Sequence, residues 1–290
     1  MAGFISHRAL VDAQEYTGAQ QYATWRKSPT QVTTIGIWFD LSMSPGNPVP
    51  QYYAAAPLVA QRLARSTDGG LNHGGNVSSS YKFLRRLMAM TVTATALPMP
   101  MILCDYLLFY PFIDEGSTDA QAMDNTNTLS RYTDGLGVRM MAVVVGAHTQ
   151  AGGVTFTVSY TNQAGTAGRT SGTCTLTTAQ SLNGTILTSE RAVAGQVSPF
   201  IPLQSGDTGV QSVQSVTMAS ADVGLFALVL VKPLAQMSIR GIDAPVEKDY
   251  WVDHAGFPRI VDDAYLNFIC CPAGALNATA LHGDLLCAWG

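Results

Sequence analysis

Two short segments of the chain carry residues that could take part in acyl transfer. His73-Gly74-Gly75 matches the glycine loop of esterases, in which backbone N–H groups face a developing negative charge. That mechanism needs a G-x-S-x-G nucleophile turn downstream, and the sequence has none. Asp253-His254 could supply half of a catalytic triad, but no placed serine or cysteine nucleophile accompanies the pair. The sequence therefore favours a flexible loop and a surface polar pair, with no catalytic residue.

Carboxylates are the other group with possible chemistry. The densest acidic loop contains Asp114, Glu115, Asp119 and Asp124. Calcium takes oxygen ligands in such loops, but the spacing does not match an EF-hand, so a solvated acidic loop is favoured. Glycoside hydrolysis needs two placed carboxylates, and nothing selects a pair such as Asp105 with Asp253. Because nucleotide-binding glycine motifs are also missing, we expect neither a metal nor a cofactor.

The cysteines are odd in number and form no C-x-x-C pair. They are Cys104, Cys174, Cys270, Cys271 and Cys287. The adjacent pair rarely closes on itself because the peptide geometry is strained, and the histidines lack the short spacings that zinc requires. We predict buried, reduced thiols, consistent with synthesis in a reducing cytoplasm.

The composition excludes several classes of protein. Charged residues make up 12% of the 290 residues, against roughly 25% in a typical soluble domain, and hydrophobic residues make up 47%. The formal net charge is -4, and the longest basic feature is Arg85-Arg86 near Lys82, which excludes a nucleic-acid partner. A disordered chain would have the opposite composition. The chain should therefore bury a large core and expose little charge.

No segment has the pattern of a signal peptide or of a membrane helix. The N-terminus lacks a long apolar stretch. The longest apolar zone, 96–113, is interrupted by Pro98, Pro100, Asp105 and Pro111, whereas a membrane helix needs ~20 mostly apolar residues. We therefore expect a soluble protein without a membrane partner.

The N-terminal part of the chain shows little periodicity. Residues 1–31 are polar, with a weak helical pattern over 9–22, and we interpret them as an N-terminal extended arm that gains order from contacts outside its own core. The β-branched and aromatic segment 33–41 predicts a buried strand. A short helix is predicted over 57–65, followed by a glycine-rich loop over 68–75.

Buried strands are predicted in three further segments. In 81–96 the residues Leu84, Leu87 and Met88 suit a helix, whereas the alternation over 90–95 suits a strand, which we favour. Segment 101–113 predicts another buried strand, ended by Pro111 and the acidic loop 114–115. The apolar run 225–231 predicts a fully buried strand stopped by Lys232-Pro233. These assignments place most of the chain in β-structure.

The clearest β pattern is a hairpin. Segment 155–161 has its aromatic and branched side chains on one face and its hydroxyls on the other, and 173–177 repeats the alternation. We predict a mainly β fold, β-sandwich or jelly-roll-like, with the N-terminal arm. Residues 32–290 form a single large β domain, for which the 138–235 sandwich is a candidate core. The triplet repeat in 210–216 does not recur, so it does not indicate a solenoid.

Aromatic residues provide the remaining candidate site. Tyr52-Tyr53 and Tyr250-Trp251 could form a sugar-stacking platform, could anchor a subunit contact, or could belong to the core. The possible interface residues are Trp25, Tyr52, Tyr53, Trp251 and Trp289.

Three parts of the sequence together resemble virion structural proteins of tailed bacteriophages. They are YATWRK at 22–27 leading into GIWFDLSMSPGNP at 36–48, LCDYLLFYPFID at 103–114, and AMDN at 122–125 with RYTDG at 131–135. The resemblance covers most of the chain, but it assigns chemistry to no residue. It implies a protein of the virion, synthesised in the host cytoplasm, that decorates or stabilises the capsid. A tail or connector component is the alternative within the same resemblance.

Composition supports the same interpretation independently. Little charge, hydroxyl-rich strand faces and an unanchored arm suit a protein that buries its exterior against other subunits. The expected partners are copies of the chain itself and the major capsid protein, with no small-molecule substrate. A carbohydrate-binding module for host attachment remains an alternative, with Tyr52, Tyr53 and Trp251 as stacking residues. A hydrolase with unrecognised carboxylates is the least favoured.

Overall fold

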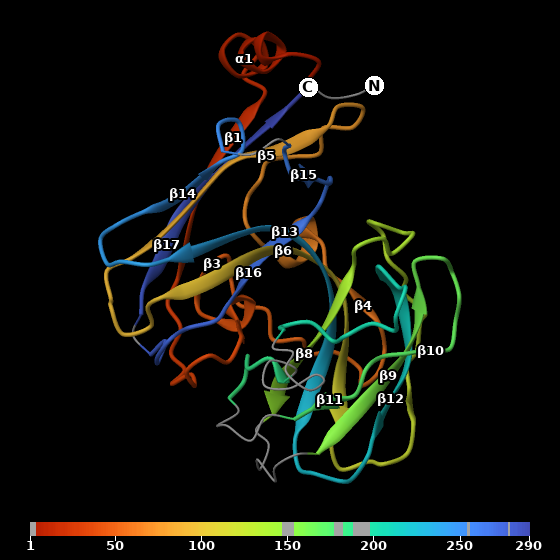
Figure 1. Cartoon of the computed structure of the whole chain (residues 1–290). Helices are drawn as coiled ribbons and strands as arrows, with labels where there is room; N and C mark the ends of the chain where they lie inside the picture. The colour runs from red at the N-terminus through yellow and green to blue at the C-terminus, as the bar shows by residue number, and fades with distance from the viewer. Residues whose placement is uncertain (1–3, 147–153, 177–181, 188–197, 254–255, 278) are drawn as a thin grey trace.

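The computed structural model describes residues 4–146, 154–176, 182–187, 198–253, 256–277 and 279–290. The protein is mainly β, with 43% of residues in strands and 6% in helices, which confirms the predicted fold class. Within the described residues the strands form three antiparallel sheets that stack into a β-sandwich-like fold. Figure 1 shows both chain ends in the upper part of the molecule and β9 to β12 in the lower part.

The terminal sheet contains both ends of the chain. Its middle strand, β17, pairs with β5 on one side and with β1 on the other. In spatial order it consists of β14 (Val246–Asp249), β5 (Lys82–Thr91), β17 (Leu281–Trp289), β1 (Gln20–Lys27) and β3 (Gly46–Asn47), with β15 (Arg259–Ile260) paired to β5. The apolar C-terminus is therefore a buried strand of the chain's own fold, not a surface reserved for a partner.

The central sheet connects the two halves of the molecule. Its two longest strands, β6 and β13, pair with each other over most of their length. In spatial order it consists of β2 (Phe39–Asp40), β16 (Tyr265–Cys270), β6 (Met99–Asp114), β13 (Leu225–Ile239) and β8 (Arg139–Gly146), with β4 (Gln61–Arg62) paired to β6.

The hairpin sheet covers one end of the central sheet. Alternate residues of its strand β9 are buried, and β9 pairs with β11, which confirms the hairpin predicted from the hydroxyl alternation. In spatial order it consists of β10 (Arg169–Thr170), β9 (Thr155–Asn162), β12 (Val210–Met218) and β7 (Gln121–Ala122), with β11 (Cys174–Thr175) paired to β9. Among the described residues, the short helices are α1 (His7–Glu15) and α2 (Arg65–Asp68), and a 3-10 turn spans Leu41–Met43.

The described residues contain three buried hydrophobic clusters, and two of them lie between sheets. The terminal sandwich, formed by the terminal and central sheets, encloses Trp25, whose ring centroid lies 4.6 Å from that of Phe268. Gly283 makes room for this indole, since a Cβ there would lie 2.9 Å from Trp25 Cε2. The hairpin sandwich, formed by the central and hairpin sheets, packs Phe156 against Phe226 at 5.2 Å. Residues of β6 and β13 belong to both cores, so the two sandwiches share these strands.

Two strands run through prolines that were predicted to end them. β6 continues past Pro111 to Asp114, and β13 continues past Lys232-Pro233 to Ile239. The ladder between them shifts register between Phe226 and Leu228, opposite Pro111, and again just after Pro233. A bulge releases the backbone from regular pairing, so a proline without an N–H is tolerated there.

Two predictions near the N-terminus were wrong in extent. The predicted helix 57–65 is replaced by β4 and by α2, which begins at Arg65. Of the strand predicted over 33–41, only Phe39 and Asp40 pair, because segment 33–38 lies outside the central sheet.

The boundaries of the predicted arm and core also differ from the structure. Gln20–Lys27 forms β1 of the terminal sheet, so the 1–31 arm is wrong for this strand, whereas residues 4–19 and 28–31 lie outside the sheets. The proposed 138–235 core is incomplete by itself, because β13 pairs with β6 from outside it. In both cases the pairing partner is distant in sequence, which local patterns do not report.

Candidate interaction surface

The predicted interface residues divide between the interior and the surface. Trp25 is 2% exposed and Tyr53 is fully buried, so neither can contact a partner in the folded chain and both predictions were wrong. Tyr52 is 58% exposed, whereas Trp251 and Trp289 are half-buried.

Tyr53 belongs to a buried polar cluster around Asp40. The phenol donates to Asp40 Oδ2 at 2.5 Å, and the Ser42 hydroxyl reaches the same oxygen at 2.8 Å. Asp40 Oδ1 accepts from the Tyr106 hydroxyl at 2.7 Å and from the Ser42 N–H at 2.8 Å. Burial raises the pKa of Asp40, and these four donors oppose the shift. Because both oxygens are fully engaged, the carboxylate stabilises the fold and is not placed to act as a base.

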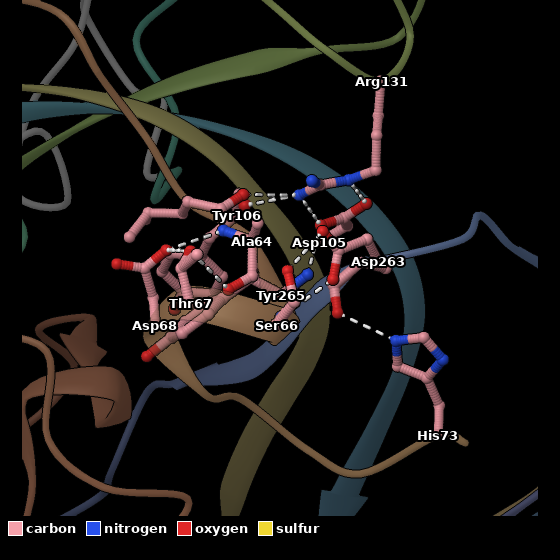
Figure 2. A network of polar contacts seen from close by, with 12 residues as sticks. Ala64, Ser66, Thr67, Asp68, His73, Asp105, Tyr106, Arg131, Asp263 and Tyr265 are labelled. Atoms are coloured by element: carbon pink, nitrogen blue, oxygen red, sulfur yellow. Dashed lines mark hydrogen bonds and ion pairs between the residues drawn. The ribbon is translucent and has the colours of Figure 1, made fainter. Parts of the chain in front are cut away.

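A second buried carboxylate, Asp105, is paired with Arg131 (Figure 2). The guanidinium donates to both carboxylate oxygens, at 3.0 and 2.7 Å, and to the carbonyls of Leu63 and Tyr106. Burial raises the pKa of Asp105 to about 6, which leaves the group ionised at neutral pH. Asp253, suggested as its partner in hydrolysis, is exposed after β14 and accepts from the Asp249 N–H. This arrangement provides no pair of carboxylates around a substrate site.

The segment that resembled an esterase loop is packed inside the terminal sandwich. His73 is buried, with Nε2 2.9 Å from the Ala264 carbonyl and Nδ1 3.0 Å from Lys82 Nζ. Lys82 also donates to the Gly75 carbonyl at 2.6 Å. Burial and the neighbouring ammonium lower the pKa of His73 to about 4, so the ring is neutral. The histidine and the lysine hold this loop in place. His254, the other histidine considered for catalysis, lies outside the described residues.

The acidic loop does not gather into a cluster of metal ligands. Asp124 accepts from the N–H of Thr126, while Glu115 is buried, which raises the pKa of Glu115 to about 7. Across the described part of the chain, no three His, Cys, Asp or Glu side chains lie close enough to hold a metal ion.

All five cysteines are free, as predicted. Cys271 is half-buried and the others are buried. Burial raises the pKa of the Cys287 thiol to about 12, so this thiol is not reactive at neutral pH.

The outer face of the terminal sheet is open to solvent. The inner face carries the core residues, so the alternate residues of β1, β5 and β17 point outward. Tyr22, 53% exposed, lies opposite the half-buried Leu286 of β17, and Met88 of β5 is half-buried on the same face. The Tyr22 hydroxyl donates to Asp284 at 3.1 Å, and Arg86 pairs with the same carboxylate at 3.2 Å. This face combines apolar area with charges that are paired within the sheet, Arg86 with Asp284 and Arg85 with Asp249, which suits a protein contact.

The N-terminal segment packs against one end of that sheet. The Phe4 ring lies 5.9 Å from Phe83, and the His7 ring lies 5.2 Å from Trp251, whose other contact is the Arg85 guanidinium at 4.9 Å. Figure 1 shows α1 at the top of the molecule, beyond the strands. Three large apolar side chains project from this region, which we call the α1 end, with exposures of 88%, 82% and 78%: Ile5, Tyr16 and Val252.

The proposed sugar-stacking platform does not exist as one surface. Tyr53 is buried, and Tyr52 follows β3 whereas Trp251 follows β14. These two strands lie at opposite edges of the terminal sheet.

Comparison with known proteins identified no related protein. No protein-family model, no curated protein and no solved structure matches the chain. Among the described residues, no helix is long and apolar enough to cross a membrane. The functional argument therefore depends on the surfaces of the chain itself.

Proposed function

We propose that this protein is a structural component of a tailed-bacteriophage virion that decorates or stabilises the capsid. It contacts copies of itself and the major capsid protein, and it performs no catalysis. The resemblance of the sequence to virion proteins is the reason for assigning the protein to a virus particle. The chemistry of its surface supports a role in assembly.

The observation that carries the proposal is the exposure of large apolar side chains at the α1 end. Ile5, Tyr16 and Val252 are each more than three-quarters exposed, and they lie at the end of an open sheet face. Single exposed apolar residues are common, but two large ones flanking α1 and a third next to Trp251, which contacts His7, suit a protein contact.

The interior supports a non-enzymatic role. The carboxylates Asp40 and Asp105 are saturated by donors from the chain itself. His73 is neutral and bonded at both ring nitrogens. Groups held in this way stabilise the fold and have no free position for a substrate.

Co-sedimentation with shells of the major capsid protein from the same phage tests the proposal. We expect the wild-type chain to sediment with shells. Val252→Lys should weaken this binding by about tenfold or more, because a charge is placed in an apolar contact. Val223→Lys is the matched control, since Val223 is also exposed, at 62%, but lies beside β13 at the hairpin-sandwich end.

Two outcomes would count against the proposal. Wild-type chain that stays in the supernatant at all shell concentrations would remove the capsid role. Equal losses for both variants would show that the α1 end is not the contact. Electron microscopy of labelled virions then separates the head from the tail or connector alternative.

A further inference from the structure

The edge of the terminal sheet at β1 is only partly covered. β1 pairs with β17 along its whole length, but on its other side β3 pairs only with Arg26 and Lys27. Among the described residues, no strand pairs with the outer side of 20–24, which we call the free edge. Proteins usually protect such an edge with lysine, proline or a bulge, because unpaired backbone groups are a template for another strand. This segment, QQYAT, has no charge and no proline, and its ladder to β17 has no register shift.

The backbone groups that face this edge follow from the hydrogen-bond pattern. The Trp289 N–H donates to the Ala19 carbonyl at 3.0 Å, so odd-numbered residues of β1 bond to β17. On the other side, the Ser28 N–H donates to the Pro45 carbonyl, so even-numbered residues point toward β3 and the free edge. The residues whose backbone groups point out of the sheet are Gln20, Tyr22 and Thr24.

Side-chain amides already occupy part of the free edge. Gln21 Nε2 donates to the Tyr22 carbonyl at 2.8 Å, and Asn47 Nδ2 donates to the Thr24 carbonyl at 3.3 Å. Each amide stands where the N–H of a neighbouring strand would lie. Among the described residues, no acceptor outside the β17 ladder bonds to the N–H groups of Tyr22 and Thr24. These donors point toward a strand that the chain itself does not provide.

We propose that the free edge of β1 pairs antiparallel with the free edge of a second copy, about a two-fold axis at Tyr22. In this register Tyr22 lies opposite its own counterpart, and the Thr24 N–H meets the Gln20 carbonyl. The Gln20 N–H and the Thr24 carbonyl stay bonded within the chain. The Tyr22 carbonyl, which accepts from Gln21 Nε2 in the single chain, exchanges that amide for the Tyr22 N–H of the second copy. The inference rests on the proposed function, because it assigns self-association to one edge of the terminal sheet.

Length and charge favour a second copy over an unrelated strand. The free edge is bounded by β3 at Arg26 and by Gly18, whose φ of 64° turns the chain away. A two-fold axis through the middle of residues 20–24 matches this stretch to itself in full. Arg26 of one copy lies opposite Gly18 of the other, so no like charges meet. The contact is isologous and joins two terminal sheets into one.

Disulfide trapping tests the register. Directly opposite residues in such a pair have Cα atoms about 5.5 Å apart, within disulfide range. Tyr22→Cys should therefore form a covalent dimer on a non-reducing gel. Thr24→Cys is the matched control, since its two copies would lie about 14 Å apart and should remain unlinked. A mixture of Gln20→Cys and Thr24→Cys chains should link, and the wild type reports any background from the half-buried Cys271.

A second variant separates pairing from folding. Thr24→Pro removes an N–H that the β17 ladder does not use, so the fold should persist while dimerisation measured by sedimentation weakens by about tenfold. A wild-type chain that is monomeric at high concentration, or a dimer in which Tyr22→Cys fails to link, overturns the edge pairing. Shell binding distinguishes the two proposals. A monomeric chain that binds shells overturns the edge pairing but not the capsid role. A disulfide-linked dimer that does not bind shells overturns the capsid role but not the edge pairing.

Discussion

The two sandwiches share the central sheet but are built in different ways. The hairpin sandwich takes β9 and β11 from neighbouring segments, and β9 buries every second residue. The terminal sandwich joins β1 to β17, which lie at opposite ends of the chain, and encloses Lys27, Lys82 and His73. Each of these groups is bonded to a carbonyl or to a neighbour. One half therefore depends on local apolar alternation, and the other on long-range pairing with buried polar bonds.

This difference has a consequence for stability. The contribution of apolar contacts to the free energy of unfolding changes little with pH. The contribution of a buried neutral histidine or a buried ion pair depends on the protonation state of its groups. The chain also places its exposed apolar α1 end on the polar-bonded half. We expect the terminal sandwich to respond to solution conditions and the hairpin sandwich to respond mainly to packing.

The largest effect should come from the ion pair that lies between the two halves. Asp105 and Arg131 are almost fully buried, and Asp105 lies in β6, which belongs to both sandwiches. Removing either partner, by Asp105→Leu or Arg131→Met, leaves an uncompensated buried charge and should lower the free energy of unfolding by about 3–5 kcal/mol. Denaturant titration measures this loss, and the double variant should lose much less than the sum.

Hydrogen exchange shows whether that loss reaches both halves. If β6 couples the sandwiches, the protection of β17 and β12 should fall together in each single variant. A loss confined to one strand would show that the halves unfold independently, and the comparison would then describe two separate units.

A smaller effect should follow from acidification. The folded pKa of His73 is about 4, below its ordinary value of 6.5. Between these two pH values the histidine is protonated in the unfolded state and neutral in the folded state. Stability is complete above pH 6.5 and is lost as the pH falls toward 4, by up to about 3 kcal/mol. His73→Gln should remove this dependence, while His282→Gln, on the outer face of the terminal sheet, should keep it.

The hairpin end should show the opposite sign. Burial raises the pKa of Glu115, at the end of β6, to about 7, above its ordinary value of 4.5. The folded state therefore binds a proton more tightly, and stability rises as the pH falls from 7 to 4.5. Local protection measured at pH 7 and pH 5 should decrease in β5 and increase in β12. Equal decreases in both strands would contradict the division into a pH-sensitive and a packing-dominated half.

Sequence patterns predicted the local parts of this fold and failed for the long-range parts. Alternation identified β9 and β11 because both the pattern and the pairing are local. The partner of β1 is more than two hundred residues away, so the polar 20–27 segment was interpreted as an arm. Prolines were taken as strand ends because composition does not show that Pro111 and Pro233 fall at register shifts.

The candidate interface shows the same limit. Tyr52 and Tyr53 are identical neighbours in sequence, yet one is exposed and the other donates to Asp40 inside the core. Low overall charge indicated a concealed surface, but it could not identify the buried charges, such as Asp105. The signal that was available and missed is the absence of lysine and proline in QQYAT, which marks an unprotected edge strand.

The smallest effect concerns the triplet repeat VQSVQSV in β12. A regular strand alternates with period two, which would place Val210 and Val213 on opposite faces. The ladder to β9 shifts register between Val210 and Ser212 and between Val213 and Ser215. At each shift β12 contains one residue more than β9, so the valines recur every third residue on the same face. Val210, Val213 and Val216 are therefore all buried.

Two single substitutions test that geometry in the packing-dominated half. Val213→Ala removes buried methyl groups and should lower the free energy of unfolding by about 2 kcal/mol, since the site lies in the core. Ser212→Ala, the neighbouring control, should change it by less than about 0.5 kcal/mol, because within the described part of the chain this half-buried hydroxyl bonds only to the Gln214 amide. Period-two alternation would reverse the ranking, placing Ser212 inside and Val213 outside. Denaturant unfolding of the two variants decides between a bulged strand with period three and a regular one.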